Sequence, residues 1–237
     1  IFGKISTGAL SDLGNVTNED TDIVIPTVGG NDTDDVAIDA STVTLIDPNN
    51  PSNTGNSTTP LVITGVGTYS VDNLGNVTFD PVDNYNGPAN VNYTIQDNDP
   101  TTPLTSNVAT IGITVTSVND VPVVVSETNS TPEDTQLVVS AAAGLLTNDS
   151  DLDGDPLSIV TFEVGGTTYN AGQTASLTEG TLKITSDGGY VFTPASNFNG
   201  TVPQVTYNVT DGTVVTPIPG TLDIEVTPVN DAPVAVN

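Results

Sequence analysis

The chain has 237 residues, enough for one large domain or two ordinary ones. Its 29 acidic residues outnumber two basic ones, Lys4 and Lys183, and the net charge of −27 excludes a nucleic-acid backbone as a partner and disfavours an anionic membrane surface. There is no Cys and no His, which excludes disulfides and the common catalytic triads and argues against zinc. The chain begins with Ile1 and not Met, which predicts a fragment of something longer.

Four short motifs occur twice, in the same order and with an offset of about 113 residues. The motif pairs are residues 19–21 and 133–135, 77–87 and 191–200, 93–97 and 207–211, and 118–122 and 229–233. A nearly constant offset of this length indicates two domains in tandem. We place them at residues 1–120 and 121–237.

Both repeats have the pattern of β-strands. Residues 108–116 and 221–227 alternate apolar and polar side chains, and so do residues 90–95 and 204–209. Gly, Asn, Asp and Pro form turn signals between such segments. The sequence therefore predicts an all-β fold: two tandem Greek-key β-sandwich domains with about seven strands each.

Three local features add detail to this prediction. Tyr93 and Tyr207 each precede an acidic loop, and we expect them in the domain cores rather than on a ligand-binding face. Residues 140–146 are helix-like but contain a glycine, which predicts a single turn. Residues 47–57 lack an apolar anchor, which predicts a mobile surface loop.

The stretch at residues 148–156 has a carboxylate at every second position and turn residues at its end. Its carboxylates belong to Asp149, Asp151, Asp153 and Asp155. Four close like charges repel one another, and oxygen-only ligands suit Ca²⁺. The loop is not an EF-hand, because Phe162 stands where the twelfth-position Glu would be. The alternative is a solvated acidic turn without an ion.

Domain 1 has a shorter version of this loop. Residues 31–35 align with the start of the acidic stretch, but the Asp-Gly-Asp-Pro tail is missing. We therefore expect domain 2 to bind calcium better at this end than domain 1.

These motifs resemble the tandem cadherin-like, Ig-like β-sandwich repeats of very long bacterial surface adhesins, including those of the RTX type. The resemblance is carried by Val-Asn-Asp-x-Pro at the junction, Glu-Asp-Thr near the start of each unit, the Asp-rich loop and Asp211-Gly212. It covers nearly the whole chain and is most specific over residues 119–237. Domain 1, with residues 38–48, is also similar to fibril-type repeats of bacterial surface proteins.

In cadherin-like folds calcium sits between consecutive domains, so the resemblance implies three groups of ligands. At the junction of the two domains they would be Glu19, Asp20, Asn119, Asp120, Asp151, Asp153 and Asp211. A junction with a following domain would use Glu133, Asp134, Asn230 and Asp231, and one with a preceding domain Asp32, Asp34 and Asp97.

The predicted function is a calcium-rigidified structural extender of a bacterial cell-surface adhesin, projecting a distal binding module for adhesion and biofilm formation. The cofactor would be Ca²⁺ and the partners neighbouring repeats of the same chain, with no nucleic acid, no membrane insertion and a monomeric fragment. The location would be extracellular, at the cell surface. One alternative is a calcium-dependent carbohydrate- or peptide-binding module, although aromatic residues are few. The other is an enzyme with paired carboxylates, which we do not expect.

Overall fold

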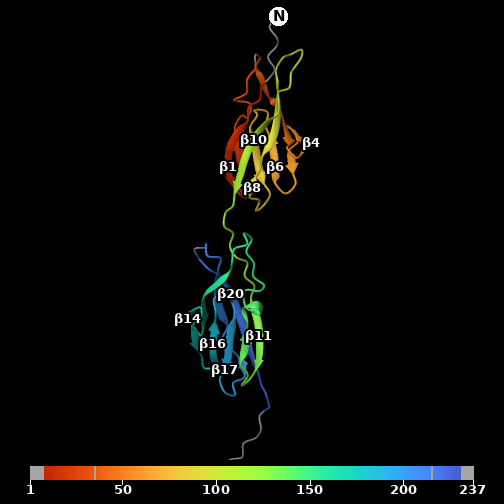
Figure 1. Ribbon diagram of the computed structural model, residues 1–237. Coiled ribbons are helices and arrows are strands. Elements are labelled where there is room, and N and C mark those ends of the chain that lie inside the picture. Colours follow the sequence, from red (N-terminus) through yellow and green to blue (C-terminus); the bar gives the residue numbers. More distant parts are fainter. Residues whose placement is uncertain (1–7, 35, 215, 231–237) are drawn as a thin grey trace, which may run out of the picture. The chain divides into compact units, whose positions relative to one another are not determined.

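The segments with alternating apolar and polar side chains form β-strands in both repeats (Figure 1). The structure is a computed structural model that describes residues 8–34, 36–214 and 216–230. The chain divides into two compact units, Ile1–Val118 and Asn119–Asn237, which are described separately below. The described residues are almost entirely strand and turn, with one short 3₁₀ helix. This confirms the predicted all-β class and the two sandwiches.

Unit 1 contains ten strands among its described residues. They are β1 (Asp12–Asn18), β2 (Ile23–Ile25), β3 (Ile38–Asp47), β4 (Asn50–Gly55), β5 (Leu61–Ile63), β6 (Gly67–Val71), β7 (Val77–Pro81), β8 (Gly87–Pro88), β9 (Val91–Asp97) and β10 (Ala109–Thr116). One sheet has the order β1-β10-β9-β3-β4, with β8 also paired to β10, and the other has the order β2-β7-β6-β5. Because β2 and the run from β5 to β7 belong to the second sheet, the chain crosses between the layers four times.

Unit 2 repeats this plan strand for strand. Its elements are β11 (Glu127–Pro132), β12 (Leu137–Val139), η1 (Ala141–Ala143), β13 (Ser158–Val164), β14 (Thr167–Asn170), β15 (Thr174–Ser176), β16 (Gly180–Ile184), β17 (Tyr190–Pro194), β18 (Gly200–Thr201), β19 (Val205–Thr210) and β20 (Ile218–Thr227). The sheets run β11-β20-β19-β13-β14, with β18 on β20, and β12-β17-β16-β15. The single turn expected at residues 140–146 is η1.

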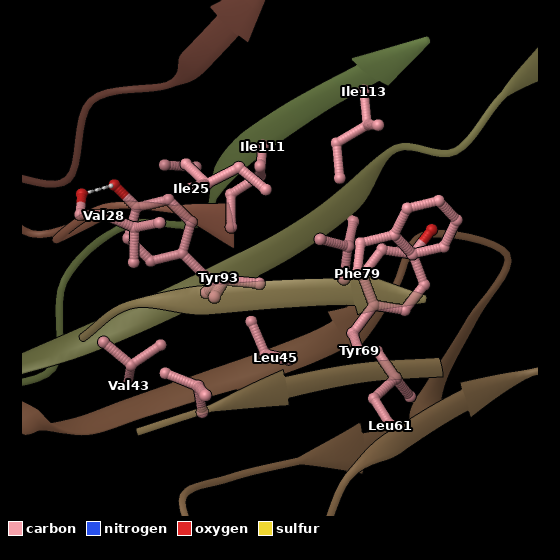
Figure 2. Close-up of a cluster of buried hydrophobic side chains, with 14 of the residues drawn as sticks. Ile25, Val28, Val43, Leu45, Leu61, Tyr69, Phe79, Tyr93, Ile111 and Ile113 are labelled. Carbon is pink, nitrogen blue, oxygen red and sulfur yellow. Dashed lines mark hydrogen bonds between the residues drawn. The ribbon is translucent and has the colours of Figure 1, made fainter. Parts of the chain in front are cut away.

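The alternation of buried and exposed side chains along the strands creates the two hydrophobic cores. In β9 every second residue is buried, from Val91 to Asp97, because successive side chains point to opposite faces of the sheet. Figure 2 shows the inward side chains of unit 1, where the rings of Tyr69 and Phe79 lie 4.5 Å apart. Burying a Leu or Phe side chain of this kind contributes about 1.5–3 kcal/mol, so each layer is stabilised by the other.

Tyr93 and Tyr207 are core residues, as the sequence predicts. Both side chains are fully buried. The Tyr93 hydroxyl donates to the carbonyl oxygen of Val28 at 2.9 Å, which is the dashed line in Figure 2. The Tyr207 ring lies against Gly220, where an added Cβ would come within 2.5 Å of the ring. A glycine at this position therefore makes room for the aromatic ring.

Two expectations about local structure are wrong. Residues 47–57 are not a mobile loop, because β3 and β4 form a hairpin there. The Asp47 carboxylate is buried and accepts the backbone N–H of Asn49 at 2.8 Å and of Asn50 at 3.3 Å, so polar bonds replace the missing apolar anchor. Each unit also has more strands than seven, because strands of two or three residues are too short to show a period in the sequence.

Candidate calcium site

The acidic loop of unit 2 folds around Asp151. The Oδ1 atom of this residue accepts the backbone N–H of Asp153 at 3.0 Å and of Asp155 at 3.2 Å. Gly154 completes the turn with φ of +79°, a left-handed conformation that suits glycine. The sequence Asp-x-Asp-Gly-Asp therefore sets up its own loop through one side chain.

This loop brings three of the predicted ligands together. One carboxylate oxygen from each of Asp151, Asp153 and Asp155 lies within 4.8 Å of the others. Calcium binds oxygen at about 2.3–2.6 Å, so two oxygens on opposite sides of one ion are about 5 Å apart. The Oδ2 atom of Asp151 is buried and has no hydrogen-bond partner in the described chain. A buried carboxylate oxygen without a donor is costly, and a cation would satisfy it. The residues present therefore fit calcium.

The first two residues of unit 2, Asn119 and Asp120, are hydrogen-bonded to the end of the unit that carries the acidic loop. The Asp120 backbone N–H donates to Asp153 Oδ2 at 2.7 Å, and the Asn119 side chain donates to Asp211 Oδ2 at 2.9 Å. Asp211 is 6% exposed, and its other oxygen accepts the N–H of Thr213 at 2.6 Å. The hydrogen bond from Asn119 lowers the pKa of Asp211, so this carboxylate keeps its charge.

Asp149 is placed differently from the three loop carboxylates. Its Oδ1 accepts the Val125 N–H at 2.8 Å, and its Oδ2 is buried without a hydrogen-bond partner among the described residues. Burial raises the pKa of Asp149. This residue lies near Tyr207 and Glu127 rather than in the group around Asp151.

The C-terminal ends of the two units have equal geometry. Glu19 and Glu133 are 4% and 6% exposed, and their Oε1 atoms accept the N–H of Val118 at 2.5 Å and of Val229 at 2.6 Å. Each Glu thus holds the backbone that leaves its own unit. The sequence signal for this role is the repeated Glu-Asp-Thr.

The aspartate after each glutamate has a turn role. Asp20 and Asp134 have φ of 55° and 57°, and their carboxylates accept the N–H of Asn84 at 2.9 Å and of Asn197 at 3.0 Å. Asn230 is exposed, and Asp231 lies outside the described residues. The predicted ligands at this end thus remain a prediction.

At the N-terminal end of unit 1 the predicted ligands have protein partners. Asp32 Oδ1 accepts the Leu10 N–H at 2.6 Å, Asp34 Oδ1 accepts the Val36 N–H at 3.3 Å, and Asp97 Oδ1 accepts the Leu104 N–H at 3.1 Å. Among the described residues of this unit, these three do not form a group of carboxylates close enough for one ion.

Sequence reasoning missed a second kind of acidic cluster, which occurs in both units. In unit 1 the Tyr93 hydroxyl lies 2.7 Å from Leu10 O, 3.1 Å from Asp32 and 3.3 Å from Asp12. Burial raises the pKa of both carboxyls. A hydroxyl has one proton and cannot donate to all of these acceptors, so a protonated carboxyl would supply the missing donor.

The same cluster in unit 2 consists of Glu127, Asp149 and Tyr207. The Tyr207 hydroxyl donates to Glu127 and lies 3.2 Å from Val125 O. Burial raises the pKa of Glu127. Glu127 and Asp12 begin equivalent strands, β11 and β1, and this repeated position was the available sequence signal.

Two family models match the chain, one for each unit. Residues 119–228 match the bacterial cadherin-like domain, and residues 17–111 match the surface adhesin CshA repetitive domain. The second repeat is thus similar to a bacterial cadherin-like domain, and the first is similar to a repeat of a surface adhesin. Neither family description is that of an enzyme, and the surface-adhesin repeat is consistent with a place at the cell surface.

Solved structures with a similar fold include a cadherin fragment, a desmocollin ectodomain and an endo-fucoidan hydrolase. A fragment of mouse cadherin-23 (EC22–24) has 18% identity and a TM-score of 0.48, and covers 94% of this chain and 64% of its own. The human desmocollin-1 ectodomain has 14% identity and a TM-score of 0.41, over 96% of this chain and 41% of its own. The chain thus spans less than two thirds of either structure, and the similarity concerns the fold alone.

A search of curated proteins gave no match. The described residues contain no helix with the length and apolar character needed to cross a membrane.

Proposed function

We propose that this pair of adhesin repeats is a calcium-rigidified extender, which holds a distal binding module away from a bacterial cell. The observation that carries the proposal is the loop around Asp151. It places three carboxylates within reach of one ion and leaves a buried oxygen without a donor. The family matches support the location, because both families are surface-adhesin or cadherin-like repeats.

The attachment of the linker supports the mechanical part of the proposal. Within unit 1, Glu19 accepts the N–H of Val118, the last residue of that unit. Within unit 2, Asp153 and Asp211 accept hydrogen bonds from Asp120 and Asn119. An ion coordinated by Asp153 or Asp211 would therefore act on the backbone that leads into unit 2.

The negative charge of the carboxylates explains why calcium would change the stiffness of the linker. Carboxylates that crowd together repel one another without a cation, and the net charge of −27 adds to this repulsion. A bound Ca²⁺ would replace repulsion by shared coordination, so that bending the linker would require breaking metal–oxygen bonds. Extracellular calcium modules bind at about 10⁻⁴–10⁻³ M, which is near the calcium concentration outside cells.

Small-angle scattering of the whole chain tests this function. We expect one extended shape in millimolar Ca²⁺ and a broader, more compact ensemble in chelator. Asp120→Ala should reproduce the chelator result in Ca²⁺, with the folding of each unit checked by circular dichroism. Glu163→Gln is the matched control, because it removes one exposed charge from β13.

Magnesium at the same concentration and ionic strength separates coordination from charge screening. If Mg²⁺ stiffens the chain as well as Ca²⁺, or if the chain is equally rigid in chelator, calcium does not control the linker and the proposed function is wrong.

A further inference from the structure

Unit 1 has a hollow of about 420 Å³ that none of the acidic residues lines. It lies where the β3–β4 turn, the β5–β6 segment, the chain from β8 into β9, and β10 meet. Ile63, Val66 and Ala89 supply aliphatic surface, and Pro48 and Pro88 supply two rigid rings. Small-molecule sites in proteins have volumes of about 300–1,000 Å³ and a mainly apolar lining, so this hollow is large enough for one small ligand.

Two asparagines give the hollow a fixed set of donors. Asn90 Oδ1 accepts the Ile113 backbone N–H at 3.1 Å, and Asn92 Oδ1 accepts the Thr110 hydroxyl at 2.9 Å. Because each amide oxygen is engaged, the orientation of each amide is set. The Nδ2 groups keep their N–H bonds for an acceptor on a ligand.

The neutral lining selects against charged ligands. The chain has a net charge of −27, which repels anions. Asp47 is next to Pro48 but is 7% exposed, and its carboxylate is engaged with Asn49 and Asn53. A cation would thus find no carboxylate in the hollow, and a neutral ligand fits best.

Strand pairing argues against a peptide. An extended peptide usually binds by adding to a free strand edge. The strands that supply Asn92 and Thr110, β9 and β10, are each paired on both sides. Ile63 lies in β5, an edge strand, but there the Asn53 side chain already donates to the Val62 carbonyl oxygen at 2.9 Å. A ligand here must be held through side chains.

Unit 2 lacks these features at equivalent positions. Gln204 precedes β19 as Asn90 precedes β9, but its Nε2 donates to the Asp223 carboxylate at 3.0 Å and 3.3 Å. The side-chain amide of Gln204 is therefore already engaged, and the Asp223 carboxylate places a negative charge beside it. The β13–β14 turn is Gly165-Gly166, in place of Pro48-Asn49.

We propose that the hollow of unit 1 binds one sugar residue of a neutral glycan. The C–H face of the sugar, or an acetamido methyl, would contact Ile63 and Val66. Its oxygens would accept from the amides of Asn90 and Asn92. No aromatic ring lines the hollow, so we expect the binding of one sugar to be weak. This role is independent of the extender function, because no candidate calcium ligand is involved.

Ligand-observed NMR with the whole chain tests the proposal. The probes are chitotetraose, mannopentaose, lactose, a sialylated lactose and a proline-rich peptide. We expect saturation transfer to at least one neutral sugar in both Ca²⁺ and chelator. Asn90→Asp should weaken it at least about tenfold, by replacing donors with a charge. Pro48→Asp should do the same from the opposite wall, and melting curves check that both variants fold.

Gln204→Ala is the matched control in unit 2 and should leave sugar binding unchanged. The proposal is overturned if no neutral sugar binds, if only the peptide or the sialylated sugar binds, or if binding survives Asn90→Asp and Pro48→Asp. Loss of binding in chelator would also overturn it, because it would assign the sugar to the calcium loop.

Discussion

The N-terminal ends of the two units begin alike and then differ. In both, an Asn-Asp pair places an aspartate near a buried tyrosine, Asp32 beside Tyr93 and Asp149 near Tyr207. Unit 1 then passes Asp34 and enters β3, whereas unit 2 makes a further turn around Asp151 before β13. The number of carboxylates in the sequence is therefore a poor guide to ion binding.

This difference shows what makes an acidic segment a candidate ion site. In unit 2 a side chain accepts two backbone N–H groups, so the loop backbone is fixed and the remaining oxygens converge. In unit 1 the carboxylates accept hydrogen bonds from separate segments and are not gathered. Four predictions test this contrast, from the largest expected effect to the smallest.

Calcium should stabilise unit 2 more than unit 1. A ligand that binds only the folded state stabilises by about 1–3 kcal/mol at ten to a hundred times its Kd. Hydrogen-exchange mass spectrometry in Ca²⁺ and in chelator should show slower exchange around residues 148–156 and little change around residues 31–35. Equal protection in both conditions would mean that the acidic loop is a solvated turn.

Neutralising one carboxylate should change the calcium affinity differently in the two acidic loops. Asp151→Asn should weaken calcium binding about tenfold or more, which corresponds to about 1.4 kcal/mol, because the loop loses its central ligand. Asp34→Asn should leave the Kd unchanged. Calorimetry of both variants gives the comparison, and the reverse order would show that the two acidic loops are wrongly aligned.

The buried tyrosines should differ in their contribution to stability. The Tyr93 hydroxyl has more acceptors around it than the Tyr207 hydroxyl, so Tyr93→Phe removes the donor from the cluster in which donors are already fewest. We expect Tyr93→Phe to cost about 1–2 kcal/mol and Tyr207→Phe about 1 kcal/mol in chelator. Chemical denaturation measures both, and equal costs would contradict this reading of the unit 1 cluster.

The raised carboxyl pKa values predict the direction of a pH effect. Glu127 binds its proton more tightly in the folded state, so its contribution to stability is full below the unfolded pKa of about 4.3 and is lost as pH rises through the folded pKa. Glu127→Gln should therefore raise the free energy of unfolding at neutral pH by roughly 0.5 kcal/mol after allowance for solvent screening, and with it the melting temperature.

The same variant should have less effect at acidic pH, where Glu127 is already neutral. Glu163→Gln removes an equal charge from an exposed strand position and controls for net charge. Asp211 acts in the opposite sense: its lowered pKa gives stability above about pH 4 that is lost as pH falls through the folded pKa. A melting temperature of Glu127→Gln that tracks Glu163→Gln at every pH would show that Glu127 is not desolvated.

The repeat and the alternation of side chains were enough to predict the fold, because both are long-range regularities of the sequence. They indicated the all-β class, the two sandwiches and the burial of Tyr93 and Tyr207. They failed at the β3–β4 hairpin, whose turn is held by Asp47 and leaves no apolar pattern.

From residue spacing alone, the site could be predicted only where its candidate ligands are close in sequence. The spacing of Asp151, Asp153 and Asp155 pointed to one loop, which the structure forms. The cluster of Asp12, Asp32 and Tyr93 draws on three distant segments, and no local spacing marks it. Side chains that meet through the fold alone require the fold to be known first.

The parallel pairing of the first and last long strands has a mechanical consequence. In unit 1, β1 pairs with β10 from Asp12↔Ile111 to Asn18↔Thr116, and β11 pairs with β20 in the same way. Tension applied through the chain pulls two parallel strands in opposite directions along their common axis. The hydrogen bonds between them then carry the load together in shear, and do not open one at a time as in a peeled hairpin. Each unit thus resists extension through its own strand order, and the rate of forced unfolding is set by the breaking of this one strand pair.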